Sequence, residues 1–100
     1  MQHPVDTPRL PEHLHTFRAQ ALAEGYEEPL LREWAPATVL ETHTHPFDAW
    51  AVVVAGEMVL TTAADHRILH AGDVFRLSRD TPHVERYGPQ GAAYWVARRA

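Results

Sequence analysis

The sequence contains no cysteine, and this absence limits the crosslinks and metal sites available to the chain. Disulfide bonds are excluded, and so is a metal site built from thiolates. Any metal ion would have to be held by nitrogen and oxygen ligands, which suit iron, zinc, nickel, manganese or copper. The chain has 8 histidines that could supply such nitrogens.

An excess of basic residues is also missing. The net charge is −4 at pH 7, and the positive residues are scattered along the chain. This argues against a nucleic-acid partner bound through its phosphates. The neighbouring Arg98 and Arg99 are interpreted as solvated charges rather than as a functional patch.

Long hydrophobic runs are absent as well. The longest apolar run, residues 49–56, is far shorter than the roughly 20 residues that cross a bilayer as a helix. We therefore expect no membrane partner. Residues 1–6 have neither the basic region nor the apolar stretch of a signal peptide, so a cytoplasmic location is expected.

The residues that are present suit one globular domain. Hydrophobic residues make up 45% of the 100-residue chain, which is a normal share for a folded domain of common size. Residues 1–10 contain prolines and no apolar period, so they are predicted to form a flexible arm. Residues 11–100 are predicted to form the single domain.

A short amphipathic helix is predicted at the start of this domain. Pro11 suits the first helical position, and Gly25 is well placed to end the helix. Between them, Leu14, Phe17 and Ala21 recur at helical spacing. We expect this helix to pack on a sheet.

The rest of the chain shows short β-type runs separated by turn residues. Eight strands are predicted, and the frequent turns between them indicate a small antiparallel sandwich or barrel. Within the run 50–54, apolar residues occupy both faces, so this strand must be covered twice, by the interior and by the helix or a second subunit. The predicted strands are Leu30–Trp34, Thr38–Thr42, Trp50–Val54, Glu57–Thr62, Arg67–His70, Val74–Leu77, His83–Tyr87 and Ala92–Ala97.

The histidine pattern is the feature most informative about chemistry. His43 and His45 are one residue apart, and on a strand such side chains point to the same face. Two imidazoles placed in this way can converge on one ion at about 2.0–2.1 Å per nitrogen. His83, beyond the Gly72-Asp73 turn, could supply a third nitrogen from another strand. The three histidines are therefore candidate metal ligands.

Two segments around these histidines resemble the conserved motifs of the cupin family. Residues 43–57, HTHPFDAWAVVVAGE, resemble the first motif, a histidine pair followed by an apolar strand that ends in glycine. Residues 71–83, AGDVFRLSRDTPH, resemble the second motif, a glycine turn, a strand, a tight turn and one histidine. The resemblance implies a mainly β fold, an antiparallel double-stranded β-helix (the jelly-roll or cupin barrel) with a short N-terminal helix. It also places His43, His45 and His83 at the histidine positions of the family's metal site.

The first motif departs from the family at the residue that usually supplies a fourth ligand. Ala49 stands there, and a methyl group cannot coordinate an ion. Asp48 is adjacent but would face away in a regular strand, unless a bulge near Pro46 turns it inward. Glu85 shares a strand face with His83 and is another possible oxygen donor. The simplest interpretation is a three-histidine site completed by water or substrate, which in this family is a feature of thiol dioxygenases.

The second motif departs as well. Ser78 and Asp80 replace the usual proline and glycine, and Tyr87 stands where an asparagine is common. The Tyr87 phenol could serve the pocket as a hydrogen-bond donor or proton carrier. Tyr87 and Glu85 are therefore the candidate catalytic residues.

The leading hypothesis is a small cupin that binds one divalent transition metal and a small-molecule substrate. As an enzyme, it would most simply be an oxygenase acting on a substrate that chelates the metal. An isomerase or lyase with Tyr87 or Glu85 as proton carrier comes next. The alternative is a non-catalytic ligand-binding or sensory module. A storage or scaffolding role through dimerisation is the third possibility, and a homodimer is expected because a barrel of this size gains buried area by pairing.

Overall fold

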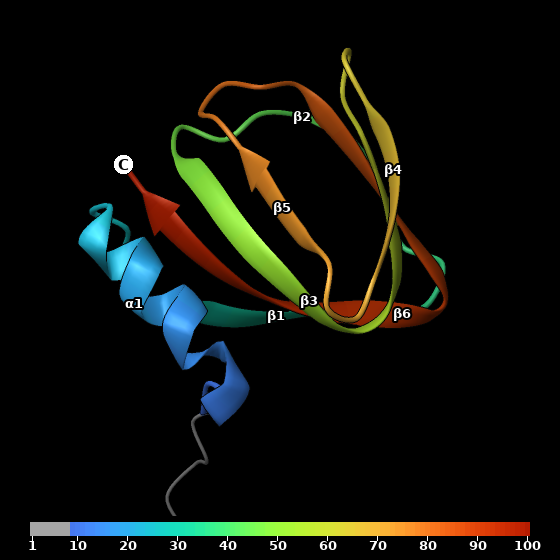
Figure 1. The fold of residues 1–100 in the computed structure, drawn as a ribbon. Helices are drawn as coiled ribbons and strands as arrows, with labels where there is room; N and C mark the ends of the chain where they lie inside the picture. Colours follow the sequence, from blue (N-terminus) through green and yellow to red (C-terminus); the bar gives the residue numbers. More distant parts are fainter. Residues whose placement is uncertain (1–8) are drawn as a thin grey trace, which may run out of the picture.

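The computed structural model describes residues 9–100 of the protein (Figure 1). Within these residues the chain is mainly β, and every strand pairing is antiparallel. The predicted fold class is thus confirmed, whereas most of the predicted arm over residues 1–10 lies outside the described residues. The strands are β1 (Leu30–Trp34), β2 (Val39–His43), β3 (Asp48–Thr61), β4 (His66–His70), β5 (Val74–Leu77) and β6 (His83–Arg99).

The predicted N-terminal helix is present as a 3₁₀ turn, η1 (Glu12–Leu14), followed by α1 (His15–Ala23). Gly25 follows the helix with φ +88°, the left-handed conformation that commonly ends a helix. Figure 1 shows α1 lying across the outer side of β1, β3 and β6. Within residues 9–100, no helix is long and apolar enough to span a membrane.

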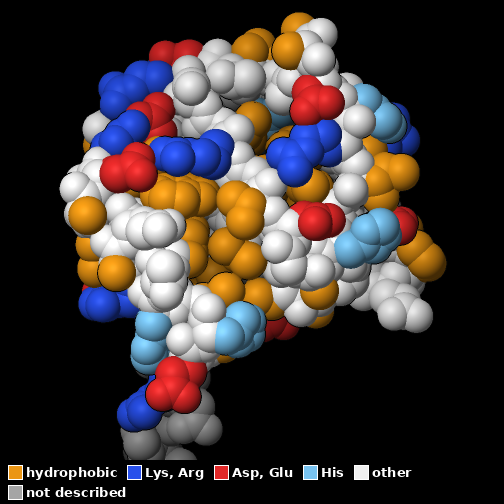
Figure 2. All heavy atoms as spheres, viewed as in Figure 1, with side chains coloured by type: hydrophobic (Ala, Val, Ile, Leu, Met, Phe, Trp, Pro, Cys, Tyr) orange, Lys and Arg blue, Asp and Glu red, His pale blue; other side chains and the backbone are white. Residues whose placement is uncertain are grey.

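The helix covers the outer face of the sheet. The sequence predicted that residues 50–54 are covered on this face by the helix or by a second subunit, and the helix does so. Phe17 on α1 meets the Trp50 ring edge-on, with ring centroids 5.6 Å apart. Figure 2 shows hydrophobic side chains gathered beside α1 on this face, with basic side chains above them. The buried side chains of this outer cluster are Leu14, Phe17, Ala21, Tyr26, Val52, Trp95 and Ala97.

The two long strands β3 and β6 pair along most of their length and bend together, so that one ladder serves two layers. In one layer, the first half of β3 and the second half of β6 lie between β5 and β1. In the other layer, the second half of β3 and the first half of β6 lie between β4 and β2. The layers face each other as in the predicted double-stranded β-helix (Figure 1).

The prediction of eight separate strands was wrong at two places. The turn residues Ala55-Gly56 and Gly88-Pro89 were interpreted as breaks, but β3 and β6 continue through both of them. The ladder absorbs the bend as register shifts between Val53 and Ala55 and between Gly56 and Met58. A bulge of this kind bends a strand without ending it.

The bend also changes which residues face the interior. Before it, Val53 of β3 points inward, and after it Met58 does, so the alternation shifts by one residue. The same shift occurs in β6, where Tyr87 and then Tyr94 point inward. The core between the layers consists of Ala49, Ala51, Val53, Met58, Leu60, Leu69, Phe75, Tyr87, Ala92, Tyr94 and Val96.

The bend requires glycine at its tightest contact. Gly56 has φ +75°, and a Cβ on it would lie 2.0 Å from the backbone oxygen of Gly91. Gly72 also has a positive φ, of +94°, but a Cβ there would have no neighbour within 4 Å. Two glycines with the same backbone requirement therefore differ in the space around them.

We predict that Gly56→Ala destabilises the fold by about 3 kcal/mol or more, because steric overlap adds to the backbone cost. Gly72→Ala is the matched control and should lose only about 1–2 kcal/mol. Urea unfolding followed by tryptophan fluorescence measures both losses. Equal losses in the two variants would show that the close approach of β3 and β6 does not limit the fold.

Candidate metal centre

Two of the candidate histidines face each other across the β2–β6 ladder. His43 is the last residue of β2 and His83 the first of β6, and they are register partners. Their ring centroids are 4.2 Å apart. This part of the sequence prediction depended on strand geometry, and the two side chains lie together as expected.

His45 lies beside these two histidines, but a loop positions it and not the strand alternation that was predicted. It lies two residues beyond the end of β2, in the loop before β3, so strand alternation does not apply to it. The loop is held because the Asp80 backbone N–H donates to the His45 carbonyl oxygen at 2.8 Å. The His45 ring stacks on Phe47 and lies 4.9 Å from the His43 ring and 5.0 Å from the His83 ring.

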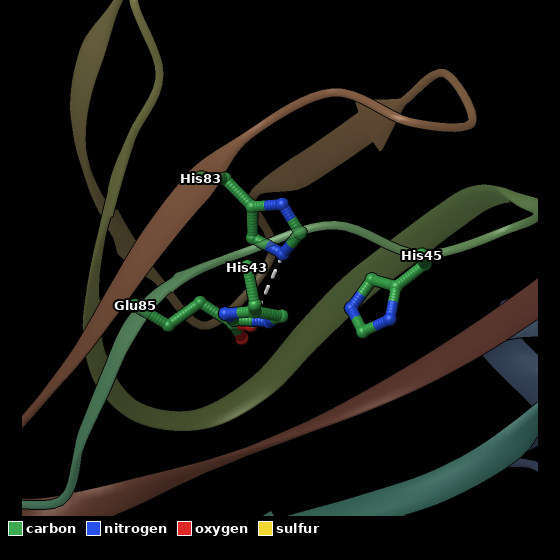
Figure 3. A group of neighbouring side chains, drawn as sticks. All are labelled: His43, His45, His83 and Glu85. Atoms are coloured by element: carbon green, nitrogen blue, oxygen red, sulfur yellow. Dashed lines mark ion pairs between the residues drawn. The ribbon is translucent and has the colours of Figure 1, made fainter.

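Glu85 completes a group of four possible ligands. It follows His83 on the same face of β6 and is buried, with 5% of its surface exposed. One ligand atom from each of His43, His45, His83 and Glu85 lies within 4.8 Å of all the others. Figure 3 shows His43 and His83 close to the Glu85 carboxylate, with His45 on the opposite side.

Backbone carbonyls fix which ring nitrogen of two histidines faces the group. The Nδ1 of His43 donates to the Glu41 carbonyl oxygen at 2.6 Å, and the Nδ1 of His83 donates to the Thr81 carbonyl oxygen at 2.9 Å. A carbonyl can only accept, so the proton of each neutral ring sits on Nδ1. The Nε2 atoms are left as bare lone pairs that point into the group. Metal-binding histidines are commonly oriented in this way.

Both Nε2 lone pairs face a further hydrogen-bond acceptor, the Glu85 carboxylate. The Nε2 atoms of His43 and His83 lie 3.3 Å and 3.4 Å from the same Oε2 atom of Glu85. Within residues 9–100, the buried Nε2 of His83 has no hydrogen-bond partner. Acceptors that converge away from water repel one another unless a positive charge lies between them. Either extra protons or a metal ion must provide that charge.

The spacing fits a metal ion. Two ligand atoms that are each about 2.1 Å from one ion lie about 3.0–3.4 Å apart in octahedral or tetrahedral geometry. Both histidine–carboxylate separations fall within this range. Three imidazole nitrogens and one carboxylate oxygen also form a donor set suited to iron, zinc, nickel, manganese or copper.

The electrostatics of the group favour a charged carboxylate. Burial acts to raise the pKa of Glu85, but the nearby His83 imidazole and the hydrogen bond from Tyr87 together outweigh it and lower the pKa. The interaction with Glu85 in turn raises the pKa of His83, against the effect of burial. Burial lowers the pKa of His45, and the neighbouring His83 and His43 lower it further.

Glu85 is held from behind by a tyrosine. The Tyr87 hydroxyl donates to the Oε1 atom of Glu85 at 2.5 Å, so the two carboxylate oxygens face different partners. Tyr94 lies farther away, with its hydroxyl 3.4 Å from the same oxygen. Burial raises the pKa of Tyr87 far above its ordinary value, so this phenol stays protonated and acts as a donor.

The structure distinguishes Asp48 from Glu85, the two carboxylates considered as replacements for the absent fourth ligand. Asp48 accepts from the Arg79 backbone N–H and from the Arg99 side chain, each at 2.8 Å, and these bonds lower the pKa of Asp48. It therefore lies away from the histidines, as expected for a regular strand. Glu85 is the carboxylate that joins them, and Ala49 contributes only a methyl group to the pocket wall.

The four side chains open onto a cavity of about 120 Å³ between the two layers. Tyr87 is absent from its lining, so this phenol reaches the cavity only through Glu85. Arg32 and Arg98 do line it, although Arg98 was interpreted as solvated and Arg32 was not singled out. The other lining residues are Leu30, Trp34, Leu40, His43, His45, Phe47, Ala49, Phe75, Leu77, His83, Glu85, Tyr94 and Val96.

Comparison with known families agrees with the resemblance noted in the sequence. A family model described as "Cupin domain" matches residues 30–95, well over half of the 100-residue chain. The chain therefore belongs to the cupin family, and the histidine group described above lies within the matched region. No curated protein matches the sequence at a significant level.

Solved structures show the same fold at low sequence identity. A structural-genomics protein of unknown function from Rhizobium leguminosarum bv. viciae 3841 has a TM-score of 0.68 at 18% identity, covering 72% of this chain and 68% of its own. The DMSP lyase DddQ from Ruegeria pomeroyi DSS-3 has a TM-score of 0.64 at 21% identity, covering 70% of this chain. This chain spans only 36% of that lyase. KdgF from Halomonas sp. has a TM-score of 0.62 at 20% identity, covering 73% of this chain and 69% of its own.

We predict that Tyr87→Phe destabilises the metal-free protein by about 1–3 kcal/mol at pH 7, because the buried Glu85 carboxylate loses a donor. A carboxyl with a lowered pKa stabilises the fold above its unfolded-state pKa, and this contribution is lost as the pH falls through the folded-state pKa. Removing the donor raises the folded-state pKa of Glu85. The destabilisation should therefore shrink as the pH falls to about 3.5.

Urea unfolding at both pH values measures this difference. Tyr26→Phe is the control, since the Tyr26 hydroxyl contacts Arg76 on the outer face at 3.3 Å and not the histidine group. A loss for Tyr87→Phe that is the same at both pH values would mean that Tyr87 does not stabilise the charged carboxylate.

Proposed function

We propose that this cupin binds one divalent transition metal ion through His43, His45, His83 and Glu85. The observation that carries the proposal is the convergence of two bare Nε2 atoms on one carboxylate oxygen, at 3.3 Å and 3.4 Å. The unpartnered Nε2 of the buried His83 adds to it. A bound cation would satisfy all of these acceptors at once.

The alternative source of positive charge is a doubly protonated histidine. The structure supports this alternative less well, because an imidazolium would donate from Nε2 to Glu85. The His83 Nε2 lies 3.4 Å from the Glu85 Oε2 but forms no hydrogen bond with it within the described residues. Neutral imidazole is also the commonest metal ligand in proteins.

We further propose that the site acts on a small molecule that enters the cavity and chelates the ion. When bound, the ion would polarise such a ligand as a Lewis acid and, if it is iron, supply redox chemistry with dioxygen. The chain itself contributes fixed ring orientations, a carboxylate held by Tyr87 and an apolar wall that limits access of water. Held in this way, the donors need little rearrangement when a ligand arrives.

An oxygenase fits this arrangement better than a lyase or isomerase. Neither oxygen of Glu85 faces open cavity, because Oε1 accepts from the Tyr87 hydroxyl and Oε2 faces the Nε2 atoms of His43 and His83. Tyr87 does not line the cavity and stays protonated, so we expect it to position Glu85 rather than to carry a proton. The similarity to a DMSP lyase keeps lyase chemistry as the second candidate.

A non-catalytic sensor and a homodimer both stay predictions. The same cavity could serve a sensory module, and turnover distinguishes the two. Exposed apolar residues on β4 and β5, Ile68 and Val74, would suit pairing with a second copy. Light scattering at micromolar concentration measures the oligomeric state.

We predict that His45→Ala leaves a folded protein that has lost most of its bound metal, and that Glu85→Gln weakens metal binding by about tenfold or more. His70→Ala is the matched control, because this β4 histidine is exposed and pairs only with Glu57 among the described residues. Elemental analysis of untagged protein, with circular dichroism to confirm folding, measures the outcome. Full metal content in His45→Ala would place the ion elsewhere.

We also predict that protein loaded with ferrous iron consumes oxygen when it is given small chelating substrates, such as small thiols. The zinc-loaded protein and His45→Ala should not consume oxygen. An oxygen electrode measures the rates, and mass spectrometry identifies the products. Cleavage of a substrate without oxygen uptake would favour the lyase, and ligand binding without turnover would favour the sensor.

A further inference from the structure

Two arginines, Arg32 and Arg98, line the cavity wall, and no ion pair among the described residues explains their presence there. Arg32 lies on β1 opposite Tyr94, and Arg98 lies farther along β6. The Leu30–Val96 pair separates them along the ladder. Side chains from both positions line the same cavity as the histidines.

Neither guanidinium has an acidic partner in the part of the chain that the structure describes. Within residues 9–100, no ion pair or side-chain hydrogen bond involves Arg32 or Arg98. The arginines that do form ion pairs among these residues are Arg18, Arg67, Arg76, Arg79 and Arg99. The two cavity arginines therefore differ from most of the arginines in the chain.

Aromatic rings of the cavity wall support the two guanidinium groups. The Arg32 guanidinium carbon lies 5.2 Å from the centroid of Trp34, and that of Arg98 lies 5.2 Å from the centroid of Phe47. Both rings line the cavity themselves. Contact with a ring face orients a guanidinium and leaves its N–H groups free to donate at the edge.

The charge balance of the cavity points to an anionic ligand. Among the described residues that line it, Glu85 is the one acidic residue, against two arginines. A divalent ion at the histidines would raise the positive charge further. Positive charge that lines a partly enclosed cavity attracts anions, and an uncharged ligand would leave this charge unbalanced.

The size of the cavity restricts the ligand further. Its volume is about 120 Å³, and an apolar cavity of about 150 Å³ is known to hold a benzene molecule. A nucleotide or an oligosaccharide would not fit inside it. Apolar side chains such as Leu77 and Val96 provide contacts for a short carbon chain.

We infer that the ligand is a small organic acid whose carboxylate is bound by Arg32 and Arg98 while a second donor group faces the histidines. This inference rests on the proposed metal site, because it assigns the other end of the ligand to the ion. The arginines select for the acid, and the volume selects for a short chain.

The test uses zinc-loaded full-length protein, because zinc has no redox chemistry that would consume the probes. Calorimetric titration compares malate, succinate and 2-hydroxybutyrate, each with its neutral amide. The variants are Arg32→Gln and Arg98→Gln. Arg86→Gln is the matched control, since Arg86 lies on β6 but does not line the cavity. Elemental analysis gives the zinc content of every sample.

We expect at least one acid to bind about tenfold or more tightly than its amide, because a charge-assisted hydrogen bond is lost with the amide. Each cavity variant should lose about tenfold or more in affinity for that acid, with unchanged zinc content, while Arg86→Gln binds as the wild type does. Acids that bind no better than their amides, or unaltered binding in both cavity variants, would overturn the inference and leave the metal site standing. Failure of the wild type to take up zinc would overturn the proposed function and this inference with it.

Discussion

The bend shared by β3 and β6 is the constraint on which the rest of the molecule depends. Both strands pass from one layer to the other near Gly56 and Gly91. A side chain on Gly56 would overlap the β6 backbone at Gly91, and one on Gly91 would overlap the backbone oxygen of Trp34 at the end of β1. As a result, the first half of β6 carries His83 and Glu85 and its second half carries Arg98, yet all three line one cavity. Residues from both halves of the β3–β6 ladder therefore line the same cavity.

The chemistry of the site depends on the way this scaffold directs acceptors toward one another. The backbone carbonyls of Glu41 and Thr81 each accept a hydrogen bond from an imidazole Nδ1–H, and the Tyr87 hydroxyl donates to the Oε1 atom of Glu85. Converging lone pairs cost free energy in a buried place unless a cation joins them. In the absence of an ion, the hydrogen bonds that involve Glu41, Thr81 and Tyr87 and the packing of the fold hold these groups together. Such a site is organised before the metal arrives, which is the property that binding requires.

Much of the site could be predicted from sequence because the histidine spacing and the β pattern are local signals. His43 and His83 met as expected, while His45 met them through a loop held by Asp80 rather than through strand alternation. The choice between Asp48 and Glu85 needed the tertiary structure, since only there does Asp48 pair with Arg99. The cavity position of Arg98 could not be found by counting alternate residues, because the bend shifts the inward face of β6 by one residue between Tyr87 and Tyr94.

The alanine at position 49 has a consequence for the shape of the cavity. The charged and possible ligating groups of the cavity lie on β1, β2, the loop after β2 and β6. The β3 and β5 side of the cavity is left to Ala49, Phe75 and Leu77. A glutamate at position 49 would place a negative charge on that wall. An apolar wall instead gives the carbon chain of a small acid a surface to lie on. An alanine at position 49 is therefore consistent with both proposals, because it leaves the acidic donor of the proposed metal site to Glu85 and leaves room for a small acid.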